Sequence, residues 1–510
     1  MKPLMLDEIV AAMDGAVKSP SPVAPARRPC SATGVTTDSR CVRPGDLFFA
    51  IRGPNHDGHA FVGDALRAGA VAAVVGAGYE RPDDVEDGAV LIEVEDTVRA
   101  LGRLARFHRR QLAVDVVAVT GSNGKTTTRE MITHVLAGRW PGRCSIKSFN
   151  NEIGVPLTLL SAEPADRFLV AEVGTNAPGE IDTLGAIIEP EVAVITSVGP
   201  VHLERLGTLE GVAREKLSLL KHLRAGGCAV VNIDADVVRW YLAEMRRPPS
   251  ALLPDGGGIA RDVKIVTIGR HEEADLRLTS VRTIIAGQTS AETGTPLEPA
   301  LEFEINGKFA YRLNVLGAHN ALNALAAVAV GRRFGMEHEE IAGRLATFTL
   351  PSMRLERRRI PWRTGSQRGE IEIIVDAYNA NPASVAAAIE VLREYPCKPK
   401  GRRVIVLGDM RELGPRAGEF HEDVARQVAL GGIDMLLAVG THARRMAATA
   451  RETRKRGSLQ PKMEVHAMPD TDTAVRRVRP LCRPGDVILV KGSRAMGLER
   501  VVAALEKHAR

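Results

Sequence analysis

The stretch VTGSNGKTTTREMI, residues 119–132, combines two glycines with a lysine and a run of threonines. It continues the apolar run DVVAVT, residues 115–120, which predicts a buried strand followed by a tight turn and a helix. That succession is typical of a phosphate-binding loop, whose full pattern is G-x-x-x-x-G-K-[ST]. The pattern requires glycine at position 119, where this chain has valine. The stretch therefore predicts an α/β sheet and a nucleoside triphosphate site, with a loop shorter than that of kinases and GTPases.

The residue types inside this loop suit phosphate. Gly121 and Gly124 leave backbone N–H groups free to face phosphate oxygens, and the helix N-terminus adds partial positive charge. Lys125 can reach the β- and γ-phosphates, and the hydroxyl of Thr126 is placed to bind Mg²⁺. A plain strand-to-helix turn is the alternative, but packing does not explain a lysine at a helix start. The predicted nucleotide-binding residues of the loop are Gly121, Ser122, Asn123, Gly124, Lys125, Thr126 and Thr127.

Alternating strand and helix patterns divide the chain into three segments. Residues 1–112 contain the expected strands GVTTDSR, PGDLFFAI, AVAAVVG and AVLIEV, followed by a helix over residues 97–110. Residues 113–348 add FLVAEVG, VAVITSVG and GCAVVNID, and residues 349–510 restart with EIIVDAY, RRVIVLGDM, DMLLAVG and DVILVKG. Such alternation favours parallel, doubly wound sheets. We expect an α/β protein of three domains with these boundaries.

The composition limits the function. Of 510 residues, 45% are apolar and 25% charged, and no stretch approaches the ~20 apolar residues of a membrane helix. Six cysteines are scattered without a C-x-x-C pair, so we expect free thiols in the cytoplasm. The net charge is +6, but aromatic residues are only 4%, so anionic small substrates are favoured over nucleic acid. Segments 251–262 and 284–308 carry no motif; we interpret the first as a glycine-rich loop and the second as a connection into a β-hairpin.

Three charged residues further along the chain are candidates for the same site. Glu172 ends the strand FLVAEVG, where ligands bind in open α/β sheets, and could bind a second Mg²⁺. His202 follows the strand VAVITSVG, and Lys216 lies on an expected helix. Lys216 could neutralise phosphate or, if carbamylated by CO₂, become a metal ligand. Taken alone, Glu172 could equally be a solvated loop glutamate. The sequence alone favours a hydrogen-bonded loop histidine for His202 and an exposed helix lysine for Lys216.

The motifs taken together resemble a known family. VTGSNGKTTT, NNEIGVPLTLL, VAEVGTNAPGEI, VGPVHLERLGTLEGVAREK, LGAHNALNALAA, LPSMRLE, VDAYNANPASV, VLGDMRELG and LVKGSRAMGLERVV occur in that order, after TTDSR and PGDLFFAI. This set is similar to the ATP-dependent Mur ligases of peptidoglycan synthesis over essentially the whole chain. The resemblance implies an N-terminal UDP-binding domain, a central ATPase domain and a C-terminal Rossmann-like domain.

The resemblance also implies an activity. The stretches DAYNANP, LGDMRELG and KGSRAMGLERVV are most similar to the member that joins D-alanyl-D-alanine to UDP-N-acetylmuramoyl-tripeptide. The ligase that adds the third amino acid typically has D-Y-A-H-T-P and a D-N-P-R signature, and neither is found. A carboxylate would attack the γ-phosphate of ATP, and the amine of the dipeptide would then attack the acyl phosphate. Another Mur ligase, a folate polyglutamylating enzyme, a P-loop phosphotransferase and a binding protein without turnover are alternatives that an assay would separate.

Residue roles follow from the same resemblance. The implied catalytic residues are Lys125, Lys216 and Arg354. Asn320, Arg354 and Asp376 would contact ATP, and a hinge near residues 345–352 would close the third domain over the site. The implied metal ligands are Thr126, Glu172, His202 and Lys216. The implied substrate-binding residues are Thr37, Asp38, Ser39 and Arg40 at the UDP-sugar end, Asn150 and Asn151 along the peptide, and Asn379 and Asn381 beside the reaction centre. We expect a cytoplasmic monomer that uses ATP and Mg²⁺, and the third residue of the acceptor peptide stays open.

Overall fold

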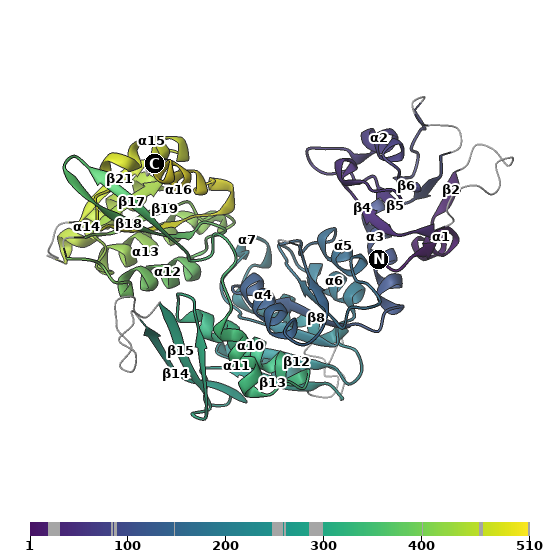
Figure 1. Cartoon of the computed structure of the whole chain (residues 1–510), viewed down its shortest axis with the longest axis horizontal. Helices are drawn as coiled ribbons and strands as arrows, with labels where there is room; N and C mark the ends of the chain where they lie inside the picture. The colour runs from purple at the N-terminus through teal and green to yellow at the C-terminus, as the bar shows by residue number, and fades with distance from the viewer. Residues whose placement is uncertain are drawn as a thin grey trace.

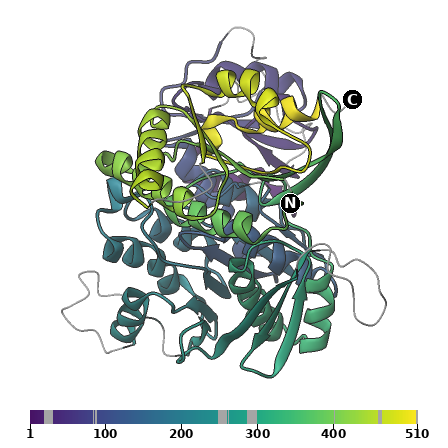
Figure 2. The same ribbon diagram turned by 90° about the vertical axis from the view of Figure 1, so that its left-hand side faces the viewer.

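Three large β-sheets follow one another along the chain in a computed structural model, and a small two-stranded sheet accompanies the first of them. The structure describes residues 1–18, 31–82, 85, 89–146, 148–246, 259, 262–284, 299–399, 401–457 and 463–507. The segments 251–262 and 284–308 are therefore described only in part. The N-terminal and C-terminal sheets both lie on one side of the central sheet (Figures 1 and 2). No described helix has both the length and the apolar character needed to cross a bilayer.

The N-terminal segment folds around a five-stranded sheet of order β2-β7-β6-β5-β4, parallel except for β2. The four expected strands and the helix over residues 97–110 are confirmed. The strands of this segment are β1 (Leu4–Met5), β2 (Ala16–Lys18), β3 (Ser31–Ala32), β4 (Gly34–Thr36), β5 (Asp46–Phe49), β6 (Ala72–Gly76) and β7 (Leu91–Val94). The helices are α1 (Leu6–Met13), η1 (Ser39–Cys41), η2 (Gly58–Phe61), α2 (Val62–Arg67) and α3 (Thr97–Arg110).

Helix α3 joins the first segment to the second. Its N-terminus is capped by the Asp96 side chain, and three basic residues complement the helix dipole in its last turn. One of them, Arg109, is almost fully buried and forms an ion pair with Glu191 beside strand β11. Arg106 and Arg110 both bind Glu189. The helix therefore packs against the central segment through charges as well as through its apolar face.

The central segment is a nine-stranded sheet of order β16-β15-β14-β13-β12-β11-β8-β10-β9. From β9 to β14 neighbouring strands are parallel, and β14, β15 and β16 pair antiparallel. Its strands are β8 (Asp115–Thr120), β9 (Gly142–Cys144), β10 (Phe168–Glu172), β11 (Val192–Ile195), β12 (Cys228–Asn232), β13 (Lys264–Gly269), β14 (Leu276–Ile284), β15 (Ala300–Ile305) and β16 (Phe309–Leu313). Its helices are α4 (Lys125–Leu136), α5 (Gly154–Leu160), α6 (Glu180–Ile188), α7 (Leu203–Leu206), α8 (Leu209–Leu217), η3 (Ser218–His222), α9 (Asp236–Met245), α10 (His319–Arg333) and α11 (His338–Ala346).

Strand β8 is the point where the order of this sheet reverses. The chain passes from β8 to β9 and β10 on one side and then to β11 and β12 on the other. Ligands of open α/β sheets bind at the carboxyl ends of the strands at such a switch point. The glycine-rich loop after β8 lies at that point.

The C-terminal segment is a six-stranded sheet of order β17-β18-β22-β19-β20-β21, parallel except for β17. Helices α12, α13 and α14 pack on one face, and α15 and α16 pack on the other. The strands are β17 (Glu356–Thr364), β18 (Gln367–Asp376), β19 (Arg403–Gly408), β20 (Met435–Val439), β21 (Glu464–Met468) and β22 (Val487–Lys491). The helices are α12 (Pro382–Glu394), η4 (Gly414–Arg416), α13 (Ala417–Leu430), α14 (Ala443–Arg456), α15 (Thr471–Leu481), η5 (Arg494–Met496) and α16 (Glu499–Glu506).

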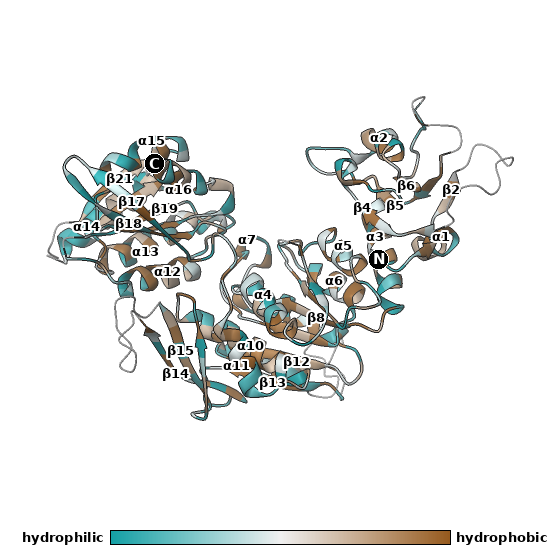
Figure 3. Ribbon diagram, in the orientation of Figure 1, coloured by the Kyte–Doolittle hydropathy of each residue, from teal (hydrophilic) through white to brown (hydrophobic). Residues whose placement is uncertain are grey.

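Apolar side chains of the strands form the cores. Separate buried clusters cover the two faces of the central sheet and the two faces of the C-terminal sheet. Hydrophobic residues concentrate on these strands and on the inward faces of the helices (Figure 3). The described cysteines are all free thiols. Stable layers thus hold the strand ends in place and leave the loops at those ends to form a site.

Candidate active site

A cleft of about 490 Å³ opens between the central sheet and the C-terminal domain. The loop after β8 forms one wall, and the residues around the start of α12 form the other. The cleft brings together most of the residues proposed from the sequence. Those that line it are Ser122, Asn123, Gly124, Lys125, Thr126, Thr127, Asn150, Asn151, Glu172, His202, Asn320, Arg354, Asp376, Asn379 and Asn381.

The two glycines of the loop are required by its geometry. Gly124 has a φ of +84°, and a Cβ there would lie 2.3 Å from Asn323 Oδ1. A Cβ at Gly121 would lie 2.0 Å from Thr196 Oγ1. Because neighbouring backbone and side chains approach so closely, only glycine fits either position. The loop is therefore a shaped cradle rather than a flexible turn.

Lys125 and the start of α4 make one end of the cleft positive. The first N–H groups of α4 have no intrahelical acceptor and face the ligand side of the loop. Lys125 Nζ donates to the carbonyl of Gly121 at 2.8 Å, so the side chain folds back over the loop. Burial lowers the pKa of Lys125, and the carboxylate of Glu172 opposes that shift. This end of the cleft suits a phosphate group.

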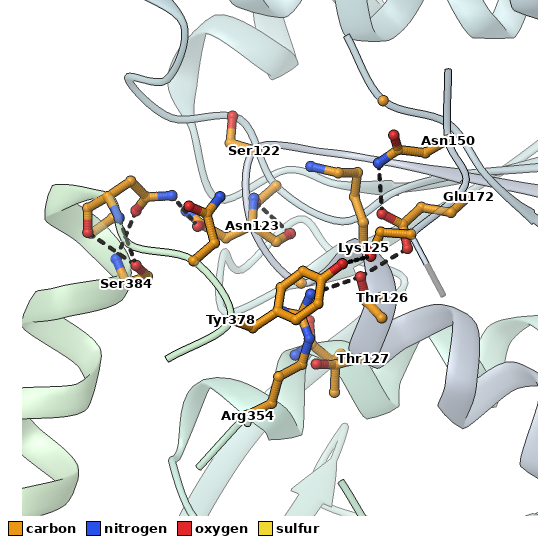
Figure 4. Close-up of a pocket in the computed structure, with 18 of the residues that line it drawn as sticks. Ser122, Asn123, Lys125, Thr126, Thr127, Asn150, Glu172, Arg354, Tyr378 and Ser384 are labelled. Carbon is orange, nitrogen blue, oxygen red and sulfur yellow. Dashed lines mark hydrogen bonds between the residues drawn. The ribbon is translucent and has the colours of Figure 1, made fainter. Parts of the chain in front are cut away.

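Thr126 is the centre of a hydrogen-bond network drawn from three parts of the chain (Figure 4). Its Oγ1 donates to Glu172 Oε2 at 2.8 Å and accepts from an Arg354 nitrogen at 2.8 Å. Asn150 Nδ2 donates to the other Glu172 oxygen at 2.9 Å. Glu172 also receives a 3.4 Å contact from the buried side chain of Arg129. An arginine of the C-terminal domain thus reaches the first turn of α4 in the central domain.

The Arg354 side chain has a hydrogen-bond donor that is not used within the described residues. Its Nε is buried and has no partner among the described residues. The guanidinium lies 4.4 Å from the ring centre of Tyr378, a cation–π contact that fixes its plane. Burial lowers the pKa of Arg354, with opposing contributions from Glu172 and Asp376. A buried cation with an unused donor, facing a phosphate-binding loop, fits a nucleotide phosphate.

The same network contains ligands suited to Mg²⁺. Mg²⁺ in phosphate-handling sites is typically held by one or two side-chain oxygens together with phosphates and water. The Thr126 hydroxyl and the Glu172 carboxylate supply such oxygens beside the loop. No described group of three or more His, Cys, Asp and Glu side chains forms a ready-made metal site. The Thr126 and Glu172 oxygens alone fit the partial ligand set of an ion that is also bound by phosphate and water.

Lys216 and His202 lie beside this network in different environments. Lys216, at the end of α8, is almost fully buried and does not line the cleft. Burial, and then the charge of Lys125, hold the pKa of Lys216 well below its ordinary value. His202 does line the cleft, and its Nδ1 lies 3.0 Å from Glu412 Oε2 of the C-terminal domain. Bonding to His202 keeps the pKa of Glu412 below its ordinary value.

Several hydrogen bonds hold the two walls together. Asn381 caps α12 through its Oδ1, and its Nδ2 donates to Asn123 Oδ1 at 2.7 Å. The hydroxyl of Tyr378 donates to the hydroxyl of Ser148. Together with the arginine contact to the first turn of α4, these bonds describe a C-terminal domain closed onto the loop (Figure 4).

The remaining predicted residues lie in other places. Thr37 and Ser39, with Asp38 and Arg40, lie after β4 in the N-terminal domain, apart from the cleft. The side-chain hydrogen bonds of Arg40 lower the pKa of Asp38 to about 2. Asn151 lines the cleft, but its side chain accepts from the backbone N–H of Gly154 at the start of α5. That bond gives Asn151 a structural role in addition to any contact with substrate.

The structure adds residues that sequence reasoning missed. Asn323 accepts from the Thr128 hydroxyl and donates to Asn320, so it supports the loop from α10. Lys491 is almost fully buried at the end of β22 and binds Asp376 Oδ2 at 2.6 Å. Tyr378, Glu412 and Lys491 all occur in motifs quoted above, DAYNANP, LGDMRELG and KGSRAMGLERVV. The signal was present, but spacing does not indicate which polar residue of a motif faces the cleft.

A glycine-rich loop at the switch point of a parallel sheet, closed by an arginine from a second α/β domain, defines an enzyme that uses a nucleoside triphosphate. Comparison with known proteins narrows this class. The chain belongs to the Mur ligase family. Residues 31–109 match the Mur ligase family catalytic domain, residues 119–331 the Mur ligase middle domain, and residues 358–494 the Mur ligase glutamate ligase domain.

Curated relatives and solved structures agree with this assignment. The UDP-N-acetylmuramoyl-tripeptide--D-alanyl-D-alanine ligase of Bacillus subtilis (strain 168) is 34% identical, covering 92% of this chain and 93% of the relative. The protein of that name from Escherichia coli (strain K12) is 33% identical, covering 93% and 94%. The crystal structure of MurF from Acinetobacter baumannii has a TM-score of 0.79 at 29% identity, with 99% of each chain covered. The Thermotoga maritima MurF ligase in complex with ADP has a TM-score of 0.72 at 28% identity, covering 93% of this chain and 97% of that one.

Proposed function

We propose that this chain joins D-alanyl-D-alanine to UDP-N-acetylmuramoyl-tripeptide at the expense of ATP. The products are UDP-N-acetylmuramoyl-pentapeptide, ADP and phosphate, and the reaction supplies a precursor of peptidoglycan. Full-length relatives carry the name of this activity, and a structural neighbour binds ADP. The observation that carries the proposal is the junction of Arg354 with Thr126, where a cation of one domain faces the phosphate-binding loop of another.

The first step brings two anions together. The terminal carboxylate of the tripeptide attacks the γ-phosphorus of ATP, and ADP leaves as an acyl phosphate forms. Lys125, which folds back over the loop, and Arg354, which reaches Thr126 from the C-terminal domain, stabilise the negative charge that spreads over the transferring phosphoryl group. The N–H groups at the start of α4 bind phosphate oxygens in the same place. These are the catalytic roles that we assign to the loop and to the arginine.

The second step forms the peptide bond. The amine of the dipeptide attacks the acyl carbon and a tetrahedral intermediate forms. Phosphate then leaves with the bonding electron pair of the C–O bond and can accept the proton that the amine nitrogen loses. Asn379 and Asn381 line the C-terminal wall of the cleft, where an incoming dipeptide would meet the acyl phosphate. Water would hydrolyse that intermediate, so closure of the C-terminal domain over the loop protects it. Positive φ angles at Met353 and Leu355 place unusual backbone directly after the expected hinge.

Mg²⁺ is the proposed metal. Thr126 would hold it beside the nucleotide phosphates, and when bound it would screen the phosphate charge against the attacking carboxylate. Glu172 and His202 are the ligands that we propose for a second ion, with a carbamylated Lys216 as a further ligand. Burial holds the pKa of Lys216 well below its ordinary value, a shift in the direction that favours the unprotonated amine with which CO₂ reacts.

The finer assignments form part of the same proposal. The N-terminal domain, residues 1–112, would bind the UDP end through Thr37, Asp38, Ser39 and Arg40. Residues 113–348 would bind ATP, with Asn320 and Asp376 contacting the nucleotide, and residues 349–510 would close the site. Asn150 and Asn151 would contact the peptide. We place the enzyme in the cytoplasm as a monomer and link it to cell-wall synthesis, cell shape and cell division.

A phosphate-release assay tests the proposed function. Purified protein with ATP, Mg²⁺ and UDP-N-acetylmuramoyl-tripeptide is given D-alanyl-D-alanine, diaminopimelate, lysine or glutamate in turn. We expect phosphate and a pentapeptide product with the dipeptide, and loss of both when EDTA or a non-cleavable ATP analogue is used. Turnover with a free amino acid instead would assign another ligase of the family. A stable phosphorylated product would assign a phosphotransferase.

A further inference from the structure

A contact beside the cleft joins the central and C-terminal domains and has no part in the mechanism above. His202 Nδ1 of the central domain lies 3.0 Å from Glu412 Oε2 of the C-terminal domain. Both residues line the cleft and also a neighbouring cavity of about 240 Å³. A histidine carried by one domain is thus held by a carboxylate carried by the other.

The chemistry of this pair assigns the histidine tautomer. An ionised carboxylate has no proton to donate, so this 3.0 Å contact favours the neutral tautomer that carries its proton on Nδ1. The lone pair of a neutral ring then lies on Nε2. Among the described residues, Nε2 has no hydrogen-bond partner, so it is free to bind another group. Metal-binding histidines show this arrangement, in which the distal ring N–H donates to a carboxylate.

The backbone conformations of His202 and Glu412 support a functional role for their contact. His202 has a φ of +52° and Glu412 a φ of +65°, a region that residues other than glycine rarely adopt. Such conformations concentrate at functional sites, where the surrounding structure imposes them. The loop that carries Glu412 is held by the backbone N–H of Met410, which donates to the buried ring of His421 at 2.9 Å.

We propose that Glu412 is a positioning residue that orients His202 so that its Nε2 faces a divalent cation bound with the nucleotide. The inference rests on the proposed function, which makes His202 a metal ligand. It adds that one domain supplies the ligand while the other supplies the group that orients it. Cation binding at His202 therefore depends on closure of the C-terminal domain. A site that is completed only on closure prevents ATP from reacting before the cleft excludes water.

Mn²⁺ binding to the full chain tests this proposal, because it measures the cation and not turnover. Free Mn²⁺ is followed by electron paramagnetic resonance during titration of the protein with ADP present. Substitution of a residue that orients a metal ligand typically weakens metal binding about 10–100-fold. Because 63% of the Glu412 side chain is exposed, we expect Glu412→Ala to weaken Mn²⁺ binding about tenfold, which is the lower end of that range. Glu412→Gln should keep part of the affinity, because its amide oxygen can still accept from Nδ1.

Two further variants make the result specific. Glu204 lines the same small cavity but has no hydrogen bond to His202, so Glu204→Ala is the matched control and should bind Mn²⁺ like the wild type. In a His202→Ala background, Glu412→Ala should have no additional effect, because the carboxylate acts through the histidine. Circular dichroism of each variant checks folding, and exposure of the Glu412 side chain favours tolerance of the change.

The outcomes separate this proposal from the proposed function. Unchanged Mn²⁺ affinity in Glu412→Ala, with wild-type protein that still joins its substrates, overturns the positioning role and leaves the ligase assignment intact. Equal losses in the wild-type and His202→Ala backgrounds show a plain contact between domains and also overturn it. A wild-type protein that forms no peptide bond in the phosphate-release assay overturns the proposed function itself.

Discussion

Arg354 offers the sharpest test of how the cleft works. It donates to Thr126 at 2.8 Å across two domains, its Nε has no partner among the described residues, and Tyr378 holds its plane. Replacing Arg354 by alanine removes one existing hydrogen bond and one donor available to phosphate. The substitution leaves the first turn of α4 with its bond to Glu172.

The expected loss can be worked from these contacts. A hydrogen bond that involves a charged group contributes about 1.5–3 kcal/mol, so the bond to Thr126 and one bond from the unused donor to phosphate together contribute about 3–6 kcal/mol. Each 1.36 kcal/mol of barrier is about tenfold in rate, so Arg354→Ala should lower kcat/KM by about 10²- to 10⁴-fold. Arg354→Lys keeps the charge but loses the planar fork, so we expect a smaller loss, about tenfold.

Stability should respond in the opposite sense. Burial lowers the pKa of Arg354, which means that the charged guanidinium is less favourable in the folded protein than in the unfolded chain. This cost is present at every pH at which the guanidinium of the unfolded chain is charged. Removing the cation therefore should not reduce the free energy of unfolding. Arg359 is the control, since it is half exposed on strand β17, which begins after Arg354, and pairs with Glu372 at the surface. Arg359→Ala should leave activity unchanged.

The assay is steady-state phosphate release with all three substrates, together with thermal unfolding followed by circular dichroism. Wild-type kcat/KM in Arg354→Ala would refute the role of the arginine in phosphoryl transfer. A marked fall in the unfolding temperature with a proportionate loss of activity would show instead that Arg354 acts mainly in folding.

Four further perturbations follow from the same geometry. Lys125→Ala should abolish phosphate release while calorimetry shows UDP-substrate binding largely intact; retained turnover would contradict the role of the loop. Lys216→Ala should lose activity that short carboxylates partly restore, and absence of rescue would leave carbamylation without support. Gly124→Ala should weaken ATP binding in a fluorescent-nucleotide assay, since its Cβ would lie 2.3 Å from a side-chain oxygen of α10; unchanged affinity would contradict the cradle geometry. Arg110 and its neighbours lower the pKa of Glu189 from 4.5 to about 2, so its stabilising effect is full above pH 4.5 and is lost as pH falls towards 2. Glu189→Gln should therefore lower the free energy of unfolding at pH 7 by about 1 kcal/mol, a figure that allows for solvent screening, and should leave it unchanged near pH 2. Denaturant unfolding measures both values. An equal loss at the two pH values would count against the ion pairs.

Much of the fold follows from local pattern. The helix over residues 97–110 and the strand over residues 115–120 have the bounds expected from the sequence. Buried parallel strands read as continuous apolar runs, and a capping aspartate marks the helix start. Strand β17 escaped prediction because it is a half-exposed edge strand with Pro361 and several arginines, which obscure the apolar pattern. Strand β14 was not predicted for a similar reason, because only two of its residues are buried and the others interrupt the apolar pattern.

The sequence also predicted the phosphate-binding role of the loop, because glycine, lysine and threonine act there through local geometry. Gly121, Gly124, Lys125 and Thr126 are neighbours in sequence, and one strand–turn–helix unit places them. Glu172 was a weaker candidate, but it sits at a strand end, and strand ends of a parallel sheet share one edge.

The sequence by itself therefore determined the α/β class, the phosphate-binding loop and, through its motifs, the family. Only the tertiary structure decided that Arg354 meets Thr126 from 228 residues away and that Glu412 holds His202. The reason is physical: strand order and the closure of one domain on another set these encounters. Neither is encoded in the spacing of nearby residues, whereas the periods of helix and strand are.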